Sequence, residues 1–175
     1  MMKKIILFAM FILSASVSAM AQLPHEFIGA SKCAICHKKP EQGGQFAIWQ
    51  QSAHAKAFDV LGTPEAKEQA AKMGVEDPQK SGKCLKCHST AYGLTEEQVS
   101  QAIKVEEGVS CESCHGAGKD YMKMSVMKDK DAAVAAGLQI PDEATCRKCH
   151  NENSPTFKSF DYKGHWEKIK HPILK

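Results

Sequence analysis

The chain contains one long apolar run, and it lies at the start. Residues 5–13 are apolar, Lys3 and Lys4 precede them, and small residues lead to Ala19-Met20-Ala21. A basic start, a short apolar stretch and an A-x-A site are typical of a secretory signal peptide. The run is shorter than the roughly 20 residues of a membrane-spanning helix. We therefore predict that residues 1–21 are a signal peptide cleaved after Ala21, and that 22–175 form a single exported domain with no transmembrane segment.

After residue 21, apolar positions recur at helical spacing, and no segment alternates strictly as a half-buried strand does. Thr63 and Pro64 are typical of a helix start, Gly74 and Gly137 of helix stops, and Thr95 with Gln98 of a capping box. The expected helices are 45–61, 64–73, 95–104, 131–136 and 162–170. The pattern predicts a mainly α protein with short helices, long loops and little or no sheet.

Composition indicates that this polypeptide needs help to form a core. Aromatic residues are only 7% of the chain, and long apolar stretches are missing after the signal peptide. A domain this small and polar has difficulty burying enough apolar surface by itself. Loss of Lys3 and Lys4 lowers the formal charge from +3 to +1, and no long run of like charge is present. We therefore expect no nucleic-acid partner.

Eight cysteines form four pairs, and each pair has the spacing C-x-x-C followed at once by histidine. In chain order the motifs, numbered 1 to 4, contain Cys33, Cys36 and His37; Cys84, Cys87 and His88; Cys111, Cys114 and His115; and Cys146, Cys149 and His150. C-x-x-C-H is the attachment site of c-type haem. The two thiols bond to the two vinyl groups of one porphyrin, and the adjacent histidine then becomes the proximal ligand of the iron. The sequence predicts four covalent haems c.

Other uses of paired cysteines explain the motifs less well. Two C-x-x-C pairs can bind a structural zinc, one pair can act as a redox dithiol, and an even count can form disulfides. None of these requires a histidine after every second cysteine. Four haems in one small domain must also lie close together. They would supply the missing core and exchange electrons rapidly.

Four further histidines are candidates for the distal position of the irons. These are His25, His54, His165 and His171. His54 has small neighbours that would admit a porphyrin, His171 precedes Pro172 at a fixed turn, and His25 would anchor the N-terminus near motif 1. His165 is expected on a different helical face from His171, so the two cannot serve one haem. A surface role is the alternative for each.

Methionines offer a second kind of axial ligand. Met122, Met124 and Met127 are candidates, since a thioether ligand raises the potential relative to imidazole. We expect instead that these three side chains pack in a helical core.

Several blocks in fixed order resemble the cytochrome c554 family of multihaem cytochromes. They are Gly29–His37, Trp49 with Ser52–Ala57, Cys84–His88 with Tyr92-Gly93, and Gly108–Gly118. The likeness covers most of residues 22–175, and the last block is the most specific. Its glycines would let backbone approach a porphyrin face.

The resemblance implies further properties. The tetrahaem type member takes electrons from hydroxylamine oxidoreductase and stacks its haems in pairs. By resemblance, His54 matches a distal ligand, three haems have two histidines, and the haem of motif 2 is five-coordinate. This chain is shorter and lacks a histidine between His115 and Cys146, where the type member carries a distal ligand. His25 is the expected substitute.

Two classes of function follow from these residues. The first is a periplasmic electron carrier between a donor and an acceptor redox protein, and not an enzyme. The second is an enzyme that reduces nitric oxide or hydroxylamine at a five-coordinate haem. A haem subunit docked on a larger membrane complex is a third arrangement.

Overall fold

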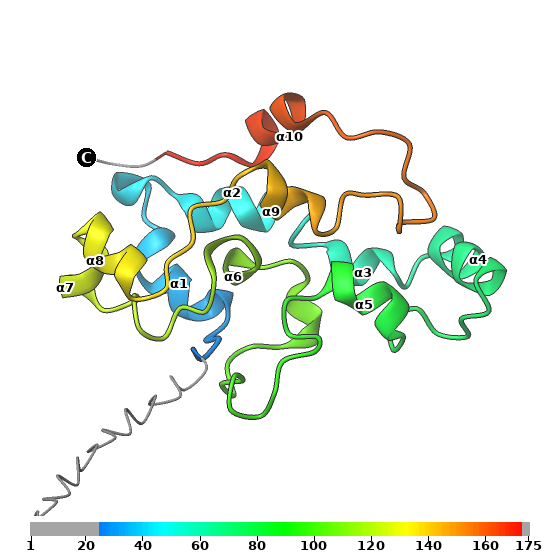
Figure 1. Cartoon of the computed structure of the whole chain (residues 1–175), viewed down its shortest axis with the longest axis horizontal. Helices are drawn as coiled ribbons and strands as arrows, with labels where there is room; N and C mark the ends of the chain where they lie inside the picture. Colours follow the sequence, from blue (N-terminus) through cyan, green and yellow to red (C-terminus); the bar gives the residue numbers. More distant parts are fainter. Residues whose placement is uncertain (1–24, 173–175) are drawn as a thin grey trace, which may run out of the picture.

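The computed structural model describes residues 25–172, so the predicted signal peptide lies outside the described residues. The elements follow one another along the chain as short helices (Figure 1). They are α1 (Ala30–His37), η1 (Pro40–Gln42), α2 (Gln45–Gln51), α3 (Ala57–Val60), α4 (Pro64–Lys72), α5 (Gly82–His88), η2 (Val105–Glu107), α6 (Cys111–His115), α7 (Met124–Met127), α8 (Lys130–Ala135), α9 (Glu143–Arg147) and α10 (Tyr162–Ile169). Within residues 25–172 there is no strand, only an isolated bridge between Phe27 and Val99. The prediction of a mainly α protein is confirmed.

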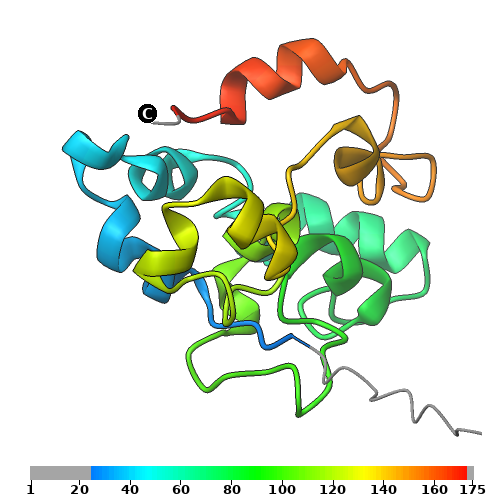
Figure 2. The same cartoon turned by 60° about the vertical axis from the view of Figure 1, so that its left-hand side comes forward.

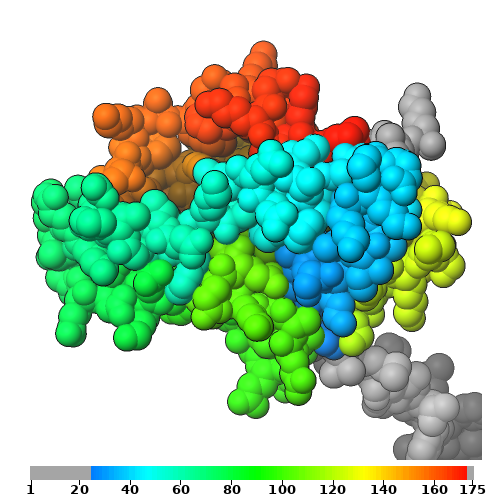
Figure 3. Space-filling model, turned by 180° about the vertical axis from the view of Figure 1, so that it is seen from behind, coloured from blue at the N-terminus to red at the C-terminus, as the bar shows by residue number. Residues whose placement is uncertain are grey.

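The helices gather around α6, which lies near the middle of the molecule (Figures 1 and 2). α1 packs against α2 and α6, while α3 packs against α5 and η2. α4 lies at one end, and the pair α7 and α8 lies at the other. Seen from behind, α1 and α2 cover the centre, and the C-terminal segment lies along one edge (Figure 3). None of the helices in the described range is long and apolar enough to cross a bilayer.

Three predicted helices are confirmed because their start and stop signals are local. The Thr63 side chain accepts the N–H of Ala66 at 3.2 Å and caps α4. Gly137 follows α8 with φ +101°, a conformation that ends helices and favours glycine. α10 spans Tyr162–Ile169, close to the expected range.

The single helix expected over residues 45–61 is wrong. The structure divides it into α2 and α3, because Ser52 is extended (φ −78°, ψ 163°) and residues 52–56 form a turn. Backbone groups of the turn bond elsewhere: the His54 carbonyl accepts the N–H of Val109 at 3.0 Å. The Trp49 indole N–H donates to the Val109 carbonyl at 2.8 Å. Pairing with a distant segment therefore overrides the helical pattern.

The helix expected over residues 95–104 is also wrong. The Gln98 side chain accepts the Thr95 N–H at 3.1 Å, so part of the capping box forms. The backbone then pairs with the N-terminal segment: the Phe27 N–H donates to the Gln98 carbonyl at 2.7 Å, and the Ser100 N–H donates to the Phe27 carbonyl at 3.0 Å. These bonds use the groups that a continuing helix would need.

The buried apolar core of the described chain is small. Its large members are Ile28, Leu61, Val75, Leu85, Ile103 and Tyr121. The helices that contain cysteine pairs contribute little to it, since α1 buries only Ala30 and α5 only Leu85. The polypeptide alone thus leaves these helices poorly packed, as the composition indicates.

Candidate haem centre

Each C-x-x-C-H motif begins in a short helix. Motifs 1, 2 and 3 lie in α1, α5 and α6, and motif 4 starts in α9 and continues into the following turn. Residues i, i+3 and i+4 of a helix share a face, so both thiols and the histidine project the same way. None of the eight cysteines forms a disulfide. This shared direction is what attachment to one porphyrin requires.

Thiols of different motifs are neighbours. Interaction with the Cys111 thiol raises the pKa of Cys33 above its usual range, and interaction with Cys33 lowers that of Cys111. Burial raises the pKa of Cys114 to about 11, with a further contribution from Cys146.

Motif 2 joins the series through motif 4. Burial raises the pKa of Cys149 to about 12, and the neighbouring Cys87 adds to this shift. The motifs are therefore neighbours in the spatial order 1, 3, 4, 2. The helices α1, α6, α9 and α5 follow one another in this order across Figure 1.

Three motif histidines are anchored through Nδ1. The His88 Nδ1 lies 2.6 Å from the Ala57 carbonyl, and the His115 Nδ1 lies 3.1 Å from the Gln139 carbonyl. The His37 Nδ1 lies 3.3 Å from the side-chain oxygen of Gln45. Metal-binding histidines typically donate their second ring N–H in this way, which leaves Nε2 for the metal.

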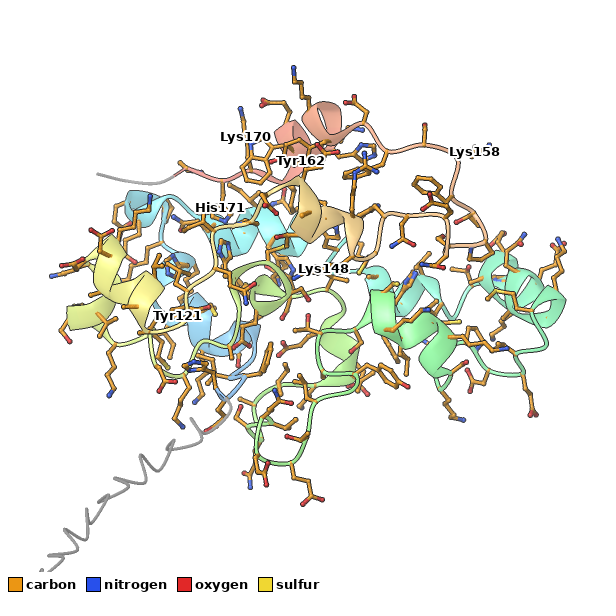
Figure 4. The ribbon with its side chains drawn as sticks, in the orientation of Figure 1. Tyr121, Lys148, Lys158, Tyr162, Lys170 and His171 are labelled. Carbon is orange, nitrogen blue, oxygen red and sulfur yellow. The ribbon has the colours of Figure 1, made fainter. Side chains whose placement is uncertain are left out.

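His171 lies beside the motif 3 histidine. The ring centroids of His115 and His171 are 5.7 Å apart. Burial lowers the pKa of both imidazoles, so both favour the neutral form that binds iron. The Gln45 side chain donates to the Pro172 carbonyl at 3.0 Å and holds this end of the chain beside α2 (Figure 4). The His171 Nδ1 is buried without a hydrogen-bond partner, an orphaned group at the place where a ligand is expected.

His54 and His165 both lie near the motif 4 histidine. The centroid of His150 is 6.0 Å from that of His54 and 6.2 Å from that of His165. Burial lowers the pKa of His54, and His150 lowers it further. Phe160 stacks on His150 at 4.8 Å and lies 5.0 Å from His165. The centroid of Phe160 is thus about equally far from both imidazoles, in the region that a porphyrin between His150 and His165 would occupy.

His25 lies apart from these clusters. Its Nδ1 is 2.5 Å from a carboxylate oxygen of Asp120, and its ring lies next to Gly137. In the described part of the chain, neither His25 nor His88 is in ring contact with another imidazole, unlike His115 and His150.

Comparison with known proteins agrees with this donor set. The family model described as "Cytochrome c554 and c-prime" matches residues 32–116. Cytochrome c-554 of Nitrosomonas europaea is 31% identical over 173 aligned residues, which span 94% of this chain and 70% of the relative. The chain belongs to the cytochrome c554 family. No solved structure matches the chain.

Members of this family are c-type cytochromes, so the chain is an electron carrier with covalently bound haem c. The residues present fit that cofactor. Each thiol pair has a histidine on its face, three of these histidines keep Nε2 free, and buried neutral imidazoles stand opposite two of the four.

The methionines of this c554-family cytochrome are not core residues as expected. Met122 is 39% exposed and Met124 is 62% exposed. The expectation of helical core packing is therefore wrong for both. Met127 is half-buried at the end of α7.

The sequence interpretation missed the role of two carboxylates in the c554-family fold. Glu112, between the cysteines of motif 3, is only 2% exposed. Its carboxylate accepts the N–H groups of Ile28 at 2.9 Å, Gly29 at 2.8 Å and Gly118 at 2.7 Å. Glu107 accepts the N–H of Ala30 at 3.0 Å. Together they bind the amides at the start of α1 and tie motif 1 to motif 3. The one sequence feature that could have indicated this role is the charged residue Glu112 within the family-specific block of residues 108–118.

Gly108 was expected to let the backbone approach a porphyrin face, but the structure shows a different close approach there. Its φ is +69°, and a Cβ at this position would lie 2.7 Å from the carbonyl oxygen of His54. The absent side chain thus lets two backbone segments approach where His54 leaves its turn. In this chain the glycine thus helps to place the turn that carries His54, a candidate ligand.

Proposed function

We propose that this protein is a periplasmic cytochrome in which residues 22–175 form one domain with four haems, and that it relays electrons between a donor and an acceptor redox protein. The observation that carries the proposal is the row of motif-bearing helices: α1 packs against α6, and α6, α9 and α5 follow one another across the molecule (Figure 1). Cofactors attached at neighbouring thiols are close neighbours themselves. A row of such groups provides a path through the molecule.

The chain's own residues hold and orient the cofactors. Each cysteine pair makes the two thioether bonds, and His37, His88, His115 and His150 are the proximal ligands. Nδ1 contacts to Ala57, Gln139 and Gln45 fix the ring planes of three of them. When bound, the haem supplies an iron that changes oxidation state by one electron. Histidine pairs and their hydrogen bonds set its potential.

Two distal ligands follow from the ring distances. Metal–nitrogen bonds are about 2 Å long, so two imidazoles on one iron have centroids roughly 6 Å apart. His171 has this relation to His115, and His54 has it to His150. His165 has a similar distance to His150, but Phe160 lies beside both rings, where a porphyrin between them would extend. We therefore propose His171 as the distal ligand of the motif 3 haem and His54 as that of the motif 4 haem. His165 is not proposed as an iron ligand.

His25 is proposed for the haem of motif 1. Its bond to Asp120 resembles the carboxylate contacts that orient ligating histidines. Glu26 to Gly29 continue directly from it to α1, so the ligand and the motif share one segment.

Haem content and electron paramagnetic resonance (EPR) test this function together. The mature protein, secreted from a host that matures cytochromes c, should show four haems by mass and by pyridine haemochrome. The variant His54→Met should convert one histidine pair to a histidine–methionine pair and raise one midpoint potential. The matched variant His165→Met should leave the spectra and potentials unchanged. A colourless protein, or equal effects of the two variants, would refute the assignment.

A second candidate function is reduction of a small ligand at the haem of motif 2. It is favoured by one observation: among the described residues, no imidazole ring contacts His88, whereas His115 contacts His171 and His37 is close enough to lower the pKa of His171. An open iron position would bind nitric oxide and give a high-spin EPR signal before addition. Low-spin signals alone, unchanged by nitric oxide, would exclude this activity.

A further inference from the structure

A groove of about 560 Å³ lies beside α1, the helix that contains motif 1. Its lining comes from α1, from the segment before α1, and from the loops near residues 101 and 121. Motif 1 is also the first member of the series 1, 3, 4, 2. The groove therefore lies at an end of the proposed electron path.

The groove adjoins the face of α1 that carries the thiols. Lys32 and Ile35 line the groove, and Cys36, four residues after Lys32, lies next to Lys32 on the helix surface. Ile35 is bonded directly to Cys36, so a molecule touching Ile35 is one residue away from a thioether bond by covalent path.

The groove combines an apolar floor with a positive rim. Ile35 is 60% exposed and Met122 is 39% exposed, and the groove brings these two apolar side chains together. Lys32, Lys119 and Lys123 surround them and are all exposed. Glu26, the one acidic residue in the lining, pairs with Lys119 at 3.1 Å. The lining therefore has an excess of two positive charges.

We propose that this groove is the docking surface for an acidic redox protein that exchanges electrons with the haem attached at Cys33 and Cys36. The proposal rests on the proposed electron-transfer function and names the chemistry of one partner. Charge complementarity selects the partner: carboxylates around an apolar contact point match lysines around Ile35 and Met122. Such contacts steer encounter and leave the complex short-lived, which suits a carrier.

The test measures electron transfer from a reduced acidic flavodoxin to the ferric holoprotein by stopped flow, at several ionic strengths. The variant K32E/K119E/K123E reverses the rim. The matched variant K158E/K163E/K168E reverses three exposed lysines of the C-terminal segment, on the opposite side of the molecule (Figures 1 and 4). Both carry the same net charge, so any difference reports position.

We expect the rim variant to lose at least 10-fold in second-order rate at low salt and to lose most of its salt dependence. The matched variant should change less than 2-fold. Equal losses in both variants, or no loss in the rim variant, would overturn the proposal. Dithionite separates this outcome from a failure of the proposed function, because it should reduce both variants fully if the haems are present. Carbodiimide cross-links between the wild-type protein and flavodoxin should map to Lys32, Lys119 or Lys123, and cross-links confined to other lysines would also overturn it.

Discussion

At the scale of single residues, Glu112 joins two attachment helices through one buried carboxylate. It accepts three backbone N–H groups from both sides of the contact between α1 and α6. Hydrogen bonds to a charged group contribute about 1.5–3 kcal/mol each, and a buried donor without a partner costs a similar amount. Removing the charge therefore affects both helices.

The variant Glu112→Gln should lower the free energy of unfolding by about 3 kcal/mol, because an amide NH₂ would face N–H donors in a site built for an acceptor. Guanidinium unfolding of the ferric holoprotein measures this change. The exposed neighbour Glu106 provides the control, and Glu106→Gln should stay within about 0.5 kcal/mol of the parent. Similar midpoints for the two variants would contradict a capping role.

Glu107 should make stability depend on pH. Burial raises the pKa of its carboxyl above the ordinary value of 4.5 and the charge of Glu112 adds to this, while the Ala30 N–H opposes it. The folded protein then holds a proton that the unfolded chain releases, so stability falls as pH rises from about 4.5 through the raised pKa. Glu107→Gln keeps an oxygen for Ala30 and should remove this slope. Thermal unfolding from pH 4 to 7 tests it, and parallel curves for variant and parent would count against it.

At the scale of elements, the sequence predicted those helices whose signals are local. The start of α4 is determined by Thr63 and Pro64, and the end of α8 by Gly137. Residues 52–56 and 95–104 have helical patterns too, but Val109 and Phe27 bind their backbone groups from far along the chain. A pattern within one segment contains no information about such partners.

The turn that carries His54 depends on Gly108. Alanine there would place a Cβ 2.7 Å from the His54 carbonyl oxygen, in addition to the cost of a positive φ. Gly93 also has a positive φ (+81°), but its Cβ would meet no atom within 4 Å. Comparison of alanine variants at Gly108 and Gly93 therefore distinguishes the cost of the close contact from the cost of the positive φ.

Gly93→Ala should cost about 1–2 kcal/mol, and Gly108→Ala should cost clearly more and shift the EPR signal of the haem for which His54 is the proposed ligand. Guanidinium unfolding and EPR of both holoproteins provide the comparison. If Gly108→Ala behaved as Gly93→Ala does, the close approach to His54 would have no role in ligation.

At the scale of the whole molecule, the cysteine spacing predicted the attachment motifs, but the spatial order of the motifs came only from the structure. Each motif is complete within five residues. The meeting of Cys33 with Cys111, or of Cys87 with Cys149, depends on the path of the entire chain. The choice between His54 and His165 likewise required Phe160, whose position no local pattern indicates.

Reduction of the assembled protein should be coupled to proton uptake. Each haem brings two propionates into a small volume, and an added electron raises the pKa of nearby carboxylates. Reduction is then easier at low pH, so midpoint potentials should fall as pH rises from 6 to 8, by up to about 59 mV per unit for one proton per electron. A spectroelectrochemical titration at several pH values measures this. Potentials independent of pH would show that the carboxylates do not respond.

The interleaved order of the motifs also constrains how the protein is made. The proposed export would deliver the chain from its N-terminus. Motif 2 would then emerge before motif 3, and the contacts of α1 with Glu112 and of Cys87 with Cys149 would form later. The N-terminal half, which contains motifs 1 and 2, has no neighbouring pair of motifs within it. A chain released before residue 150 would leave motif 2 unpartnered, and maturation would depend on ligation machinery that tolerates an open, unfinished fold until translocation ends.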